Sequence, residues 1–205
     1  MRLTKAAMFG LDARIALAIF GALSVISGAA LYSAIENAKA TAVFTEIQEL
    51  GKAFESYYID TGSFPSVENA DSSNWGHYVF LTKELSKNGE NKSNWQGPYT
   101  PLPINSNDVE HPVYGDAFIG IYEIDNGWYD FIGADAKCDN AGETCAIWVG
   151  FDGMDSLELI KSVDRLIDGE ESLPERNGSI RYKTNVSSPY RGTILYKYMP
   201  ARNTN

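Results

Sequence analysis

The chain has little of the side-chain chemistry on which catalysis and metal binding usually depend. Its 205 residues include only two cysteines and two histidines, too few by themselves for the usual zinc spacings. It has no nucleophile elbow and no phosphate-cradling glycine loop. We therefore expect a protein that is not an enzyme. Because carboxylates are plentiful, a membrane-anchored glycosidase stays open as a minor alternative.

Positive charge is also scarce. The chain has 17 lysines and arginines against 27 acidic residues, a formal net charge of −10. An acidic surface repels phosphate backbones, so we expect no nucleic-acid binding through a general basic face.

The 12 tyrosines favour a domain rich in β-strands.

One hydrophobic run is long. Ile15 to Ile35 carries no charge, and a helix needs about 20 apolar residues to cross a bilayer. The pattern then becomes amphipathic without a break, and no proline interrupts Ile15 to Tyr58. The apolar positions recur at steps of three and four, which predicts one continuous helix of about 66 Å at 1.5 Å per residue. These positions are Val43, Ile47, Leu50, Phe54 and Tyr57.

The charges beside this run predict its orientation. Arg2, Lys5 and Arg14 precede it, whereas Glu36 and Lys39 nearly cancel on the other side. The positive-inside rule puts the N-terminus in the cytoplasm and the following domain outside. Two simpler interpretations are a cleaved signal peptide and a plain single-span anchor.

Small residues dilute the apolar run. Gly21, Ser24 and Gly28 lie within it, and Ser24 and Gly28 are four apart, as in close helix–helix contacts in membranes. These residues either allow close packing against copies of the same helix or are simply tolerated in lipid.

The rest of the chain predicts a small domain of mixed structure. Gly62 and Pro65 end the long helix. A capping-box pattern at Asp155 and Glu158 opens a second helix that closes at 168–169. We expect a short helix at 79–85, a hairpin turn at 125–127, and strands at 117–122, 128–132, 146–151, 180–182 and 193–198. The predicted fold class is α+β, with a long N-terminal helix packed on a small antiparallel sheet and an extra C-terminal helix and strands.

Five features in this order resemble the type IV pilins and the major pseudopilins of type II secretion. They are a short basic leader ending in Gly10, an apolar and then amphipathic helix, the exit Tyr57-Tyr58…Thr61-Gly62-Ser63-Phe64-Pro65, and the segments Asn94-Trp95-Gln96-Gly97-Pro98-Tyr99 and Tyr129-Asp130-Phe131-Ile132-Gly133-Ala134-Asp135. The resemblance implies a leader at 1–10, a membrane and filament-core helix at 11–35, the amphipathic half of that helix at 36–60, and a pilin-like head domain at 61–205.

The resemblance also implies how the chain is processed. A prepilin peptidase would cut between Gly10 and Leu11. The family usually carries Glu at the fifth mature position, where this chain has Ile15. Asp12 would take over the pairing with a neighbour's N-terminal amine.

The implied subunit-docking residues are Asp12, Arg14, Gly21, Ser24 and Gly28. The implied partners are copies of the chain, the prepilin peptidase, the assembly machinery and the membrane. The implied location is the bacterial inner membrane, with a single span and a head domain that is periplasmic, or extracellular in the filament.

Cys138 and Cys145 predict a small disulfide-closed loop, because a membrane anchor directs the domain to an oxidising compartment. Around them lie Asp135, Asp139 and Glu143, oxygen ligands of the kind that Ca²⁺ prefers. Major pseudopilins hold calcium in the corresponding loop, so the resemblance implies a calcium site. The disulfide alternatively makes the metal redundant, and we expect no other cofactor.

These observations favour a structural subunit of a type IV pilus or a type II secretion pseudopilus, held in the membrane and then assembled through its N-terminal helix. The alternative is a minor or tip subunit of the same fold that contacts a substrate, a surface or DNA.

Overall fold

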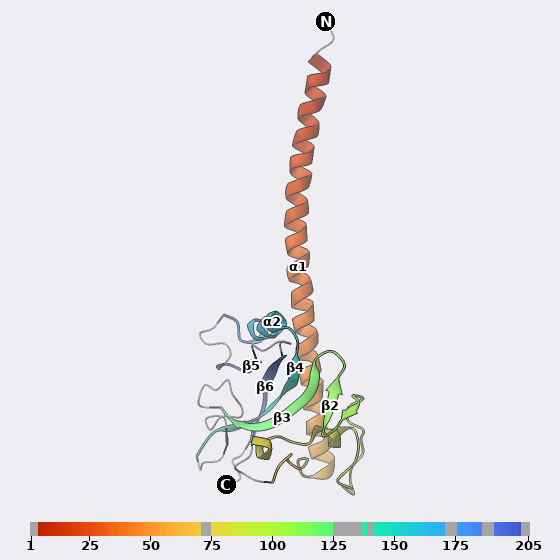
Figure 1. Cartoon of the computed structure of the whole chain (residues 1–205), viewed down its shortest axis with the longest axis vertical. Helices are drawn as coiled ribbons and strands as arrows, with labels where there is room; N and C mark the ends of the chain where they lie inside the picture. The colour runs from red at the N-terminus through yellow and green to blue at the C-terminus, as the bar shows by residue number, and fades with distance from the viewer. Residues whose placement is uncertain are drawn as a thin grey trace. The chain divides into compact units, whose positions relative to one another are not determined.

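The computed structural model describes residues 4–70, 75–124, 137–138, 142–170, 176–185 and 191–201 (Figure 1). Helix α1 spans Thr4–Thr61 without interruption and contains the continuous helix predicted from Ile15 to Tyr58. The chain divides into two compact units, residues 1–39 and residues 40–205. The change falls within α1, where burial begins at Ala40.

The C-terminal part of α1 forms one side of the core of the second unit. The predicted apolar stripe is confirmed, because Val43, Ile47, Phe54 and Tyr57 are fully buried and Leu50 nearly so. The helix ends where expected. Gly62 adopts a left-handed backbone with a φ of 71°, and its N–H donates to the carbonyl oxygen of Tyr58 at 2.8 Å.

A six-stranded antiparallel sheet faces this stripe, in the order β1-β2-β3-β4-β6-β5. Figure 1 shows β3, β4 and β6 curving beside the C-terminal part of α1. The strands are β1 Ile104–Asn105, β2 Asp108–His111, β3 Gly115–Glu123, β4 Cys145–Met154, β5 Ile180–Asn185 and β6 Arg191–Ala201. The α+β class is therefore confirmed. The predicted strands at 117–122, 146–151, 180–182 and 193–198 lie within β3, β4, β5 and β6. The sequence missed β1 and β2. The predicted hairpin at 125–127 and strand at 128–132 lie outside the described residues.

Both faces of the sheet are buried. Alternate residues of β3 point to opposite sides. Ala117 and Ile119 join the α1 stripe in the main core, whereas Phe118 and Tyr122 join a second cluster around Trp148.

Helix α2, Leu157–Ile167, covers another part of the main core with Ile160 and Val163. The prediction that Asp155 caps this helix is wrong. Ser156 is the N-cap, and its hydroxyl oxygen accepts a hydrogen bond from the backbone N–H of Leu159 at 3.2 Å. The helix closes at Asp168 and Gly169, as predicted.

The short helix predicted at 79–85 is replaced by two 3-10 turns, η1 Trp75–Tyr78 and η2 Thr82–Leu85. The sheet explains the interruption. Val79 bridges to Gly120 and Phe80 bridges to Val67, and the N–H of Phe80 donates to the carbonyl oxygen of Ile119 at 2.9 Å. These bridges hold residues 79–80 in an extended conformation.

Candidate functional site

The first candidate site is the apolar part of α1. Every side chain from Ile15 to Ile35 is exposed in the single chain. Such a surface requires either lipid or other protein around it. Large hydrophobic side chains with 44–73% exposure occur on all sides of the helix: Ile15, Leu17, Ile19, Phe20, Leu23, Val25, Ile26, Leu31, Tyr32 and Ile35.

The predicted small residues share one side of this helix. At about 100° per residue, Gly21 and Gly28 lie about 20° apart around the axis and Ser24 lies about 60° from Gly21. A Cβ atom added at Gly21 or at Gly28 would meet nothing within 4 Å. Contacts within the chain therefore do not explain why these positions are small.

The predicted leader boundary lies inside regular structure. Gly10 and Leu11 both belong to α1, and Gly10 is exposed. Asp12 and Arg14 are exposed on the next turn of the same helix. These are the last charged residues before the uncharged run.

The predicted disulfide is confirmed, since Cys138 and Cys145 are bonded with their Cα atoms 6.0 Å apart. Glu143 lies between them and is partly buried. Asp135 and Asp139 lie outside the described residues. The part of the chain that the structure describes has no group of three or more acidic, histidine or cysteine side chains suited to a metal. Calcium binding thus stays a prediction.

Segment 94–99 connects the loops to the end of α1 through hydrogen bonds. The hydroxyl of Tyr99 donates to Oδ2 of Asp60 at 2.9 Å, and its backbone N–H donates to the carbonyl oxygen of Leu85 at 2.7 Å. The indole N–H of Trp95 donates to the carbonyl oxygen of Glu84 at 3.0 Å. Burial, with the nearby charge of Asp60, raises the pKa of Tyr99.

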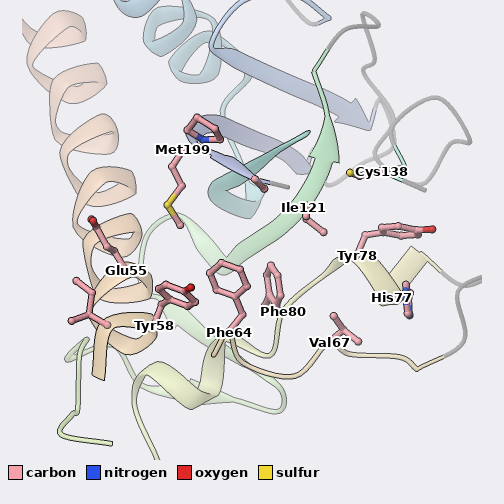
Figure 2. A pocket seen from close by; sticks show the side chains of 13 residues that line it. Glu55, Tyr58, Phe64, Val67, His77, Tyr78, Phe80, Ile121, Cys138 and Met199 are labelled. Carbon is pink, nitrogen blue, oxygen red and sulfur yellow. The ribbon is translucent and has the colours of Figure 1, made fainter. Parts of the chain in front are cut away.

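A pocket of about 640 Å³ lies in the second unit. Figure 2 shows the rings of Tyr58, Phe64 and Phe80 beside one another in it. Adjacent ring centroids are 4.6 and 5.5 Å apart. Sequence reasoning missed this pocket because its walls come from separate parts of the chain. The remaining lining residues are Glu55, Ile59, Val67, His77, Tyr78, Ile121, Cys138, Met199, Pro200 and Ala201.

Two carboxylates with perturbed ionisation were also missed. Burial, with the charge of Asp108, raises the pKa of Glu68 to about 7. Burial raises the pKa of Asp108 to about 6, with further contributions from the charges of Asp116 and Asp152 and against the hydrogen bond from Thr82. The hydroxyl of Thr82 is 3.0 Å from Oδ1 of Asp108. Neither carboxylate lines the pocket beside Tyr58, Phe64 and Phe80.

No protein-family model, curated protein or solved structure matches this chain. What the structure itself defines is an α+β protein in which one helix near the N-terminus is long and apolar enough to cross a membrane.

Proposed function

We propose that this chain is a structural subunit of a helical filament, of the type IV pilus or type II secretion pseudopilus kind. The observation that carries the proposal is the exposed, uncharged run of Ile15 to Ile35 in the same helix as the buried stripe of the second unit. In this proposal the run anchors the chain in a bacterial inner membrane with its N-terminus in the cytoplasm. Residues 40–205 then lie in the periplasm, or outside the cell once the filament has assembled.

A filament subunit must satisfy two environments with one helix. In the membrane the run contacts lipid, which requires only apolar side chains. In the filament it contacts other copies, and small residues allow helices to approach closely. The shared side of Gly21, Ser24 and Gly28, with open space around both glycines, supports this second role.

The chain itself needs no catalysis in this role, because other proteins drive its extraction from the membrane. Its proposed partners are copies of itself, a prepilin peptidase that cuts between Gly10 and Leu11, and an assembly machinery. Calcium at the loop of Glu143 remains part of the proposal, with no other cofactor.

Leucine substitutions at the glycines test the proposal. Leucine favours insertion by roughly 0.3–0.6 kcal/mol on the insertion scale, so Gly21→Leu and Gly28→Leu should still enter the membrane. Each should reduce the ladder of crosslinked copies that forms when the full chain is expressed with its own assembly machinery. Ala30→Leu is the matched control, because Ala30 lies about 180° from Gly21 around the helix.

The result separates a filament subunit from a plain anchor. Normal fractionation with lost ladders in both glycine variants, and intact ladders in Ala30→Leu, supports a filament. Unchanged ladders in all three variants would argue against packing through this side of the helix.

The pocket favours a second candidate, a minor or tip subunit whose head domain contacts a substrate, a surface or DNA. Its row of aromatic rings is a surface that a ligand of apolar character would fit. Abundance distinguishes the two candidates. A major subunit forms ladders when it alone is overproduced, whereas a minor subunit forms none without a second, more abundant subunit.

A further inference from the structure

Asp12 and Arg14 carry opposite charges at the start of the apolar run, and no side chain of their own helix offers either of them a charged partner. They are two positions apart, so they project about 200° apart around the helix and cannot pair with each other. A helical side chain reaches charges three or four positions away. All of those positions are uncharged here: Met8, Phe9, Ile15 and Ala16 for Asp12, and Gly10, Leu11, Leu17 and Ala18 for Arg14.

Both side chains are exposed in the single chain. In the membrane each lies near the end of the run, where a long arginine side chain reaches the interface. Packing among other copies removes that access to water and lipid headgroups. A charge in such surroundings is costly unless an opposite charge is close. Each helix therefore brings one unmatched acid and one unmatched base to the same level.

We propose that Arg14 of one copy forms an ion pair with Asp12 of the next copy, and that this pair sets the register between neighbouring helices. The inference rests on the proposed filament function. Because the two charges project to nearly opposite sides, each helix presents Arg14 to one neighbour and Asp12 to the neighbour on its other side. Such a contact is heterologous, and repeating it produces an open helical array unless the rotation closes a ring. The two Cα atoms differ in height by about 3 Å along the axis, and the flexible arginine side chain tolerates a larger offset.

This pairing differs from the one that the family resemblance implies, in which Asp12 neutralises a neighbour's N-terminal amine. The two partners make different demands on Arg14. An ion pair requires a positive charge at position 14, whereas pairing with the amine is indifferent to it. Variants at both positions therefore distinguish the two arrangements.

The experiment uses the full-length chain, expressed with its own assembly machinery and crosslinked in cells with an amine-reactive reagent. The variants are Asp12→Arg, Arg14→Asp and the double exchange of both. None of these changes adds or removes a lysine. Fractionation and protease accessibility of residues 40–205 check that each variant is inserted in the original orientation. The double exchange keeps the number of basic residues ahead of the span unchanged.

We expect each single variant to be inserted but to lose crosslinked ladders by about tenfold or more, because like charges meet at the contact. The double exchange should restore them. Ladders that persist in either single variant, or that the double exchange fails to restore, overturn the ion pair while leaving the filament proposal intact. Loss confined to Asp12→Arg overturns it in favour of the amine. Absence of ladders in the unaltered chain overturns both proposals.

Discussion

Gly51→Ala should destabilise this protein, although the same change stabilises most helices. Replacing a helical glycine with alanine ordinarily contributes about 1 kcal/mol of stability. Gly51 is buried in α1, where the ring of Tyr198 from β6 lies directly against its backbone. A Cβ atom added at Gly51 would lie 2.5 Å from Cδ2 and 2.8 Å from Cζ of that ring.

The magnitude follows from how far the ring must move. Carbon atoms in contact prefer about 3.5–4.0 Å, so the ring must shift by about 1 Å. The shift is resisted because the hydroxyl of Tyr198 donates to Oε2 of Glu55, one turn further along α1, at 3.1 Å. Overpacking of this kind costs about 1–3 kcal/mol. After the helical gain is subtracted, we expect a net loss of about 1 kcal/mol.

A double-mutant cycle isolates this effect. With Tyr198→Ala as the background the obstacle is absent, and Gly51→Ala should then stabilise by about 1 kcal/mol. The free energy of unfolding is measured by urea titration of the full chain in detergent. Tryptophan fluorescence reports on the second unit alone, because the four tryptophans are Trp75, Trp95, Trp128 and Trp148. Stabilisation by Gly51→Ala in the unaltered background would refute the reasoning.

Two further predictions concern ionisation and the disulfide. Because the pKa of Glu68 is raised from 4.5 to about 7 beside Asp108, its stabilising contribution is complete below about pH 4.5 and is lost as the pH rises through 7. As the pH rises from 5 to 8, Glu68→Gln should thus gain about 1 kcal/mol of stability relative to the unaltered chain, a value reduced for solvent screening. Urea midpoints of both chains at pH 5 and at pH 8 check this. A difference between the two chains that is the same at both pH values would contradict it. Replacing Cys138 and Cys145 together with alanine should lower the free energy of unfolding by roughly 2–3 kcal/mol in the loop-entropy account. An unchanged urea midpoint would show that the loop gains nothing from the bond.

The elements that sequence reasoning missed are those that depend on pairing. β1 and β2 are two and four residues long, too short for an alternating pattern to stand out. The sequence around residues 79–80 predicts a helix, but in the structure residue 79 pairs with β3 and residue 80 pairs with residue 67 as β-bridges. At Ser156, two candidate caps are adjacent, and only the backbone conformation decides between them.

The sequence alone determined the long helix, its uncharged run and its buried stripe. The run is contiguous in the sequence, and the stripe follows a local repeat of three to four residues. The disulfide was also predictable, since two cysteines allow one pairing. The tertiary structure decided which glycine is crowded, where the pocket lies, and that the charge of Asp108 raises the pKa of Glu68. These features arise where segments distant in the chain meet. Such contacts depend on the order of the strands in the sheet, in which β4 lies beside β6 and not β5, and a local repeat of three to four residues carries no information on that order.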